Sequence, residues 1–211
     1  MSVVFSGCVL AQEHGSAPKT TPVPVEVFAG NNYLNVQMVV AKHFNEKSKW
    51  GYFNMTTING DYKNTLTKNE FVSQALLNYE LFKGFSLTAG VALNYRSGFR
   101  KIAGFQYVFA NRKWLLIAVP TIDLNDSHNL ETFSLLEFKP KLTDKLGLYT
   151  RFQGLYVHNP NEATHERSFV AFRVGLSVKN YQFGLGTDAN WYGPHKAFKE
   201  NIGVFARVQL N

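Results

Sequence analysis

A strict two-residue alternation of apolar and polar side chains limits what this chain can fold into more than any other feature. It is clearest in the segment Phe85-Ser-Leu-Thr-Ala-Gly-Val-Ala-Leu-Asn-Tyr95, where odd positions are apolar or aromatic and even positions are small or polar. Successive side chains of a β-strand point to opposite faces, so this segment places one face in an apolar medium and the other in a polar one. The segment is predicted to be a long strand at the boundary between two media.

The same period of two recurs along the chain, and no helical period competes with it. Clear alternation predicts strands at 71–81, 85–95, 103–109, 170–178, 181–190 and 202–210. Less regular strands are predicted at 33–44, 50–59, 114–122, 130–142 and 146–157, with a short one at 25–29. The chain is therefore predicted to be all-β with about twelve strands, ten being the alternative count.

The connections between these strands alternate in length. Tight turns are expected at 45–49, 83–84, 111–113, 143–145 and 179–180, and longer loops at 60–69, 123–129, 158–167 and 192–200. The junction at 96–99 is the exception, being short where a long loop is due. Alternating turns and loops are typical of an up-and-down antiparallel barrel, and an even strand number places both termini at the turn end.

The composition of the polar face indicates which side of the barrel meets lipid. That face carries Ser, Thr, Gly, Ala, Asn, Gln and Arg, while lysine is mostly confined to the turns. Small and amide side chains suit a confined aqueous interior, and a dozen strands enclose more volume than side chains alone fill. Aromatic residues at the strand ends are typical of the two membrane interfaces, although aromatics also favour strands in general. We therefore predict a transmembrane barrel; the alternative, an apolar interior with water outside, would make this a secreted binding protein.

Composition and charge narrow the function classes. Charged residues make up 18% of the chain, against about 25% in an average soluble domain. No apolar run approaches the ~18 residues of a spanning helix. The net charge is +7, but the nearest approach to a basic cluster is the local trio Arg96, Arg100 and Lys101. The basic residues are otherwise scattered through turns, so no nucleic-acid partner is predicted.

The N-terminal residues predict export. Residues 1–11 contain an apolar run that ends in Val9-Leu10-Ala11, which resembles the end of a secretory signal peptide. Phe5-Ser6-Gly7-Cys8 faintly resembles a lipoprotein box, and Cys8 is the one cysteine, which excludes an internal disulfide. Residues 12–24 are predicted to be a flexible tail, and residues 25–211 a single β-barrel domain.

Over residues 25–211 this pattern resembles the small porin-like barrels of Gram-negative outer membranes. The resemblance rests on the alternating strands, the turns and loops, and the aromatic strand ends. It implies an outer-membrane location, contact with outer-membrane lipid and a passive channel. Those barrels usually end in a strand with a terminal aromatic residue. Here the last strand, Gly203-Val-Phe-Ala-Arg-Val-Gln-Leu210, has the alternation but closes with Leu210-Asn211.

The predicted lumen contains charged and amide side chains that define the candidate site. These pore-lining residues are Arg96, Arg100, Arg151, Arg173, Arg207, Glu80, Glu137, Asp188, Gln106 and Gln182, with Glu131 as a further acid. One interpretation is an arginine-lined constriction that favours anionic solutes. The other is that the arginines pair with the acids and close the lumen with ion pairs. The near balance of bases and acids leaves both open.

Catalytic and metal motifs are weak. His128, His158, His165 and His195 fall in predicted loops without a compact ligand spacing, so no metal site and no cofactor are predicted. Asp126-Ser127-His128 supplies triad residue types, but immediate neighbours seldom meet in triad geometry. An enzyme is therefore not predicted, and a lipid-directed hydrolase at the loop end remains the third hypothesis.

Two functional hypotheses lead. The first is a passive porin-like channel for small hydrophilic solutes, with a preference for anionic ones as one option. The second is a non-conducting barrel that serves as a structural or accessory subunit with envelope protein partners. They differ in whether the lumen is open or closed by ion pairs.

Overall fold

A computed structural model describes residues 22–45 and 47–210, which form one closed antiparallel barrel of twelve strands. The strands follow chain order around the barrel, and β1 closes the ring by pairing with β12. One short 3-10 helix, η1 (Leu66–Lys68), lies between the third and fourth strands. The strands are β1 (Val23–Gly30), β2 (Tyr33–His43), β3 (Trp50–Asp61), β4 (Glu70–Phe82), β5 (Phe85–Asn94), β6 (Gly98–Ala110), β7 (Trp114–Asp123), β8 (Leu130–Phe138), β9 (Gly147–Asn159), β10 (Thr164–Val178), β11 (Tyr181–Tyr192) and β12 (Ala197–Leu210).

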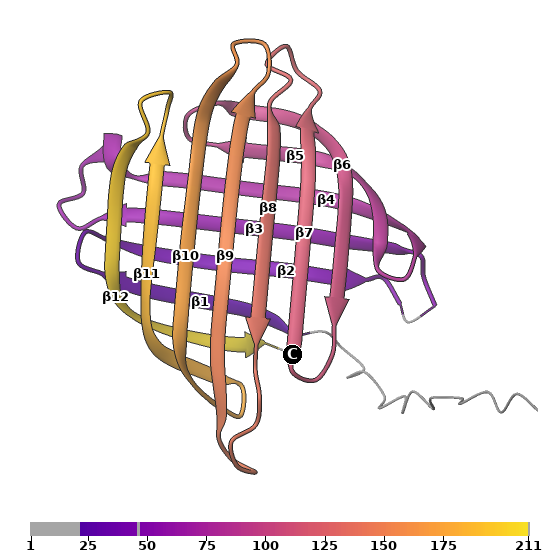
Figure 1. Cartoon of the computed structure of the whole chain (residues 1–211), viewed down its shortest axis with the longest axis vertical. Helices are drawn as coiled ribbons and strands as arrows, with labels where there is room; N and C mark the ends of the chain where they lie inside the picture. Colours follow the sequence, from indigo (N-terminus) through magenta and orange to yellow (C-terminus); the bar gives the residue numbers. More distant parts are fainter. Residues whose placement is uncertain (1–21, 46, 211) are drawn as a thin grey trace, which may run out of the picture.

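The predicted all-β, up-and-down fold and the count of twelve strands are confirmed. In Figure 1 strands β1 to β5 cross behind strands β7 to β12 at a steep angle, as strands tilted to the axis of a barrel must. The C-terminal end of β12 lies at the same end of the barrel as the turns that join β6 to β7 and β10 to β11. That end is called the turn end here, and the opposite one the loop end.

Several strands begin or end at other residues than predicted. Strand β1 begins at Val23, two residues before the expected start, so Val23 and Pro24 belong to the barrel and not to a tail. Strand β8 ends at Phe138 and not at residue 142, and β10 begins at Thr164, inside the expected loop. The predicted signal peptide at 1–11 with Cys8, and the tail as far as residue 21, lie outside the described residues.

The connection between β4 and β5 has the backbone that a two-residue hairpin requires. Lys83 and Gly84 join β4 to β5 with positive φ angles of 36° and 80°. Two-residue hairpins of this kind favour glycine because φ is positive at both central positions. A Cβ on Gly84 would also lie 2.1 Å from the carbonyl oxygen of Val108 on β6. The turn is therefore fixed both by its own geometry and by the neighbouring strand.

The two faces of the barrel wall are oriented as the alternation predicted. Leu93, Phe105 and Val174 are 45%, 46% and 38% exposed on the outer face, while Gln106 and Arg173 are buried inside. A soluble protein does not surround itself with so continuous an apolar surface, because the exposed area would drive association. The outer face therefore meets lipid, and the alternative with a dry apolar centre and polar outer face is excluded.

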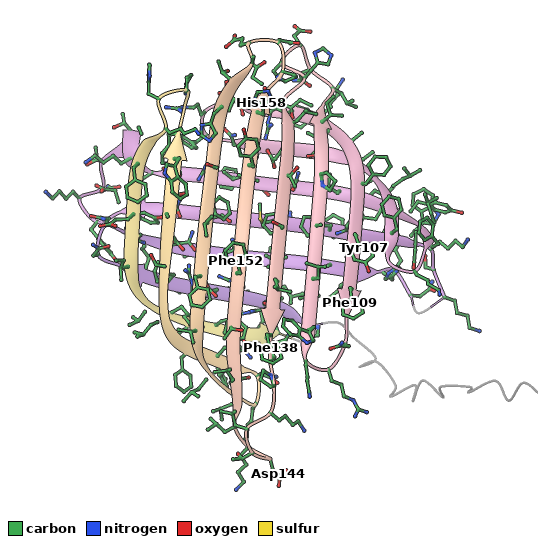
Figure 2. All side chains as sticks on the ribbon, in the orientation of Figure 1. Tyr107, Phe109, Phe138, Asp144, Phe152 and His158 are labelled. Atoms are coloured by element: carbon green, nitrogen blue, oxygen red, sulfur yellow. The ribbon has the colours of Figure 1, made fainter. Side chains whose placement is uncertain are left out.

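Aromatic side chains gather at both ends of this apolar surface. At the turn end Trp50 packs edge-on against Tyr79 with ring centroids 4.9 Å apart, and Trp114 packs against Phe138 at 4.2 Å. At the loop end Trp191 packs against Phe198 at 5.4 Å. Figure 2 shows outward side chains of this kind, including Tyr107, Phe109 and Phe138 toward the turn end and Phe152 near the middle of β9. Two aromatic belts mark the membrane interfaces of a spanning barrel.

Candidate functional site: the barrel lumen

Six charged residues form an ionic cluster inside the barrel; this name refers to Glu26, Glu137, Arg151, Arg173, Asp188 and Arg207. Glu26 on β1 accepts hydrogen bonds from Arg151 Nη2 at 2.5 Å and Arg173 Nε at 3.0 Å. Arg173 Nη1 also donates to Asp188 Oδ1 at 2.7 Å. Strands β1, β9, β10 and β11 are thus joined across the lumen by charge-assisted hydrogen bonds.

The Arg173 guanidinium lies in a space bordered by the Phe28 ring and Gly186. It lies over the ring of Phe28, 3.8 Å from the centroid, which adds a cation–π contact. Its register partner on β11 is Gly186, and a Cβ there would lie 2.5 Å from Arg173 Cδ. Arg173 is 1% exposed. A glycine opposite the arginine is therefore what allows the guanidinium to lie flat in the lumen.

Glu137 on β8 holds the part of the ionic cluster nearest the turn end. It accepts hydrogen bonds from Arg207 on β12 and, at 3.2 Å, from the Tyr149 hydroxyl. Lys139 Nζ donates to its second oxygen at 2.8 Å. The Arg207 guanidinium also contacts the hydroxyl of Tyr149. Every charge of this group therefore has a partner of opposite sign.

Two further ion-pair groups lie toward the loop end. Arg100 donates to Asp123 at 2.8 and 3.0 Å and to Glu131 at 3.2 Å. Glu70 accepts from Arg167 at 3.1 Å and from the Tyr192 hydroxyl at 2.7 Å. With these, each arginine inside the barrel is paired with at least one carboxylate. The arginines in the lumen therefore form ion pairs and do not make an unpaired ring.

Strands β3 to β8 carry apolar side chains into the lumen, which the alternation did not predict. Phe53 and Phe133 are completely buried, with ring centroids 6.1 Å apart. They belong to a larger buried cluster drawn from β2 to β9. The name apolar layer is used here for those of its members that border neither cavity of the lumen, namely Phe53, Leu76, Ala92, Ile102, Val119 and Phe133.

The apolar layer and Arg173 separate two cavities. The turn-end cavity has a volume of about 490 Å³ and the loop-end cavity about 190 Å³. Leu135 borders the first and Glu131 the second, so Phe133 between them on β8 lies at the division. On β9 the same holds for Gln153, which lies between Arg151 and Leu155. The first cavity extends to the turn end of the barrel, where Asn111 borders it. The second extends to the loop end, where Ser97 borders it.

The structure places most of the predicted lumen residues inside the barrel. Arg100, Arg151, Arg173, Arg207, Glu137, Asp188, Gln106 and Gln182 are buried there. The Gln106 carbonyl accepts a hydrogen bond from Asn78, and Gln182 Nε2 donates to Ser177 Oγ at 3.4 Å. Arg96 instead lies exposed in the turn after β5 and borders only the mouth of the loop-end cavity. Glu80 lies near the turn end, where it accepts from the Gly84 amide at 2.8 Å.

The predicted lumen residues did not include Glu26, Glu70, Asp123 and Arg167, although the sequence carries a signal for the first two. Glu26 alternates with Val25 and Val27 in a strand too short to weigh strongly. Glu70 directly precedes a clearly alternating strand. Asp123 and Arg167 were assigned to loops, but they belong to β7 and β10.

The candidate catalytic and metal-binding residues near the loop end do not converge. Ser127 Oγ donates to Asp123 Oδ2 at 3.1 Å, and His128 Nδ1 lies 3.0 Å from the Asp126 carbonyl oxygen, so the three neighbours form no relay. His165 is held by the Gly193 carbonyl at 2.8 Å and the Ser168 hydroxyl at 3.0 Å. Among the residues that the structure describes, no group of three or more His, Cys, Asp or Glu side chains is placed to hold a metal ion.

A closed, even-numbered barrel with an apolar outer face, two aromatic belts and a charged interior defines the class of membrane-spanning barrels found in bacterial outer membranes. In the described part of the chain, no helix has the length and apolarity needed to cross a membrane.

Solved structures with a similar fold include two porins. The NanC porin has a TM-score of 0.53 at 9% identity, covering 90% of this chain and 100% of that one. The KdgM porin has a TM-score of 0.44 at 8% identity, covering 90% of this chain and 99% of that one. No protein-family model matches the chain, and no curated protein does. At these identities the likeness to the NanC porin shows a common fold.

Proposed function

We propose that this protein is a porin-like outer-membrane channel that admits small hydrophilic solutes by passive diffusion. The observation that carries the proposal is the pair of cavities, bordered by charged and amide side chains, that reach opposite rims of a lipid-facing barrel. Water enters such cavities from both sides of a membrane, so only the middle of the lumen limits passage. The shared fold with the NanC porin supports the same function.

The path through the middle runs beside the ionic cluster rather than through the apolar layer. Gln153, two residues from Arg151 on β9, has both amide atoms buried without a hydrogen-bond partner among the described residues. Buried polar atoms of this kind are normally satisfied by water. Phenylalanine side chains cannot replace the water that an ion loses, whereas amide and guanidinium groups can. The solute therefore passes beside the amide and guanidinium groups. Its narrowness implies a small conductance.

A modest anion preference follows from the turn-end cavity. Its border carries three cationic side chains, Lys139, Arg151 and Arg207, against the two carboxylates Glu26 and Glu137. The loop-end cavity is balanced, with Arg96, Arg100 and Arg167 against Glu70, Glu131 and Glu166. Rings of unbalanced charge set the sign of the ions that a pore admits.

Planar-bilayer recording of the purified full chain tests this function. We expect small, discrete current steps and a reversal potential displaced toward the anion in a salt gradient. The double variant Phe53→Ala/Phe133→Ala opens the apolar layer and is expected to raise the conductance several-fold, since pore width limits the flow. Phe152→Ala, which removes the same ring from the lipid-facing side, is the control and should leave the conductance unchanged. A cation-selective current would contradict the anion preference.

The second candidate, a non-conducting accessory barrel, is favoured by one observation. Phe53, Leu76 and Phe133 are fully buried, so the apolar layer leaves no water-sized space beside them. If neither the natural chain nor the double variant produces current steps, the channel proposal is wrong and this candidate replaces it. Co-purification of a stoichiometric envelope protein would then identify the partner.

A further inference from the structure

The turn-end cavity has two chemically different walls. Val39 and Ala41 of β2, Val108 and Ala110 of β6, Leu115 and Ile117 of β7 and Leu135 of β8 form an apolar wall. Trp114 borders the same cavity at the turn end. A water-filled pore gains nothing from such a wall, because wetting apolar surface costs free energy. The wall therefore indicates a solute with an apolar part.

The facing wall is cationic and has hydrogen-bond donors to spare. Arg151 and Arg207 are each more than nine-tenths buried, and each has an Nε–H without an acceptor among the described residues. Gln106 on the same border has a buried Nε2 in the same state. Of the two carboxylates present, Glu137 accepts with both oxygens, whereas Glu26 accepts with Oε1 and its buried Oε2 has no partner among the described residues. An additional carboxylate would accept from the remaining N–H donors and match the excess of positive charge.

We propose that the turn-end cavity is a binding site for a small amphipathic monocarboxylate, an alkyl chain of medium length with one anionic head. The alkyl chain lies against the apolar wall and the carboxylate against Arg151, Arg207 and Lys139. A sugar or inorganic anion would leave the apolar wall wet, and a hydrocarbon would leave the charges unsolvated. The volume of about 490 Å³ is within the range of roughly 300–1,000 Å³ typical of ligand pockets.

This inference goes beyond the proposed channel, because a ligand can bind in this cavity whether or not solutes cross the apolar layer. Although Trp114 borders the cavity, its ring lies on the outer face against Phe138, so its fluorescence would also respond to ligand in the bilayer. Binding is therefore followed by calorimetry, which needs no reporter group.

The experiment titrates decanoate into the full chain in lipid nanodiscs and records the heat of binding, with protein-free nanodiscs as the blank. We expect a saturable change with decanoate that becomes roughly tenfold weaker in affinity with octanoate, because two buried methylenes are lost. Acetate and decanol, which lack the alkyl chain and the charge respectively, should bind at least about tenfold more weakly than decanoate. A linear, unsaturable response, equal for decanoate and decanol, would show partition into the bilayer and overturn the proposal.

Matched variants locate the binding. Ala41→Phe fills the cavity and should abolish the saturable change, whereas Ala103→Phe, the same substitution on the outer face of β6, should not. If Ala41→Phe fails to form a barrel, Ala110→Phe at the mouth of the cavity carries the same expectation. Undiminished binding by a folded cavity variant, or a co-purified phospholipid that decanoate does not displace, would refute the site. Channel recordings are independent of both outcomes.

Discussion

The two sides of the lumen close it by different physical means. On strands β3 to β8 the apolar layer fills space through the contact of rings and aliphatic chains, and none of its members depends on one particular partner. On strands β1 and β8 to β12 the ionic cluster fills space with charges, each of which needs a specific neighbour. A missing ring leaves a cavity, but a missing charge leaves its partner uncompensated in a poorly solvated interior.

The comparison implies that the ionic side is specific and the apolar side tolerant. Ring packing persists when a similar residue replaces one of its members, since volume-conserving changes usually cost less than about 1.5 kcal/mol. An ion pair between distant strands, such as Arg151 with Glu26, forms in one register only. The ionic cluster therefore specifies which strands face each other, and the apolar layer contributes bulk.

The largest expected effect is that of Arg173→Ala. It removes a partner from Glu26 and from Asp188, both buried, and should lower the free energy of unfolding by about 3–5 kcal/mol. Denaturant unfolding of the barrel in lipid vesicles measures this loss. Arg112→Ala in the exposed turn before β7 serves as control and should change little. A loss below about 1 kcal/mol would mean that the ionic cluster does not stabilise the barrel.

Phe133→Ala should follow closely, with a loss of about 3–4 kcal/mol from lost burial and the cavity it leaves. The same unfolding assay compares it with Phe133→Leu, which keeps most of the volume and should cost less than about 1.5 kcal/mol. If the two variants were equally unstable, the apolar layer would be as specific as the ionic cluster and the contrast between the two sides would disappear.

Leu185→Arg tests the outer face against both inner walls. Leu185 lies exposed near the middle of β11, so the arginine would face acyl chains and should cost about 2–4 kcal/mol. Leu66→Arg in η1, also exposed but in the loop between β3 and β4, is the control and should be neutral. Equal stability of the two variants in vesicles would argue against a bilayer around β11.

Glu70→Gln should have the smallest effect, about 1 kcal/mol, because its ion pairs with Arg167 and Lys199 are partly exposed and screened. The Tyr192 hydroxyl can still donate to the amide oxygen. Unfolding at low and high salt checks this expectation, since the difference from the natural chain should shrink as ionic strength rises. A salt-independent loss would place Glu70 with the deeply buried ionic cluster instead.

The sequence predicted the outer face and the ionic side well, and the apolar side poorly, for one physical reason. Where the lumen side chains are polar, as Gln106 and Arg173 are, they alternate with lipid-facing residues and the period of two is plain. Where the lumen side chain is apolar, as with Phe53, Val119 and Phe133, both faces of the strand are apolar and the period vanishes. The strands predicted as less regular at 50–59, 114–122 and 130–142 contribute Phe53, Val119 and Phe133 to the apolar layer, whereas Leu76 and Ala92 belong to the clearly alternating segments 71–81 and 85–95.

The pairings inside the lumen could not be predicted from the sequence. Arg151 and Glu26 are separated by 125 positions, and no local pattern links them. The balance of bases and acids did suggest ion pairing as one of two interpretations, and the structure follows it. Arg96 was predicted to line the lumen although it belongs to the junction at 96–99; residues 95–97 form a turn, which leaves its side chain exposed at the loop end.

The pairing of β1 with β12 has a consequence for biogenesis. Val23 lies opposite Leu210, so the first and last strands meet only when the whole polypeptide is available. Until that seam closes, two strand edges remain without hydrogen-bond partners, which invites association with other chains. Contacts between such distant segments also form slowly. A polypeptide of this kind is therefore open to association with other chains until its first and last strands have paired.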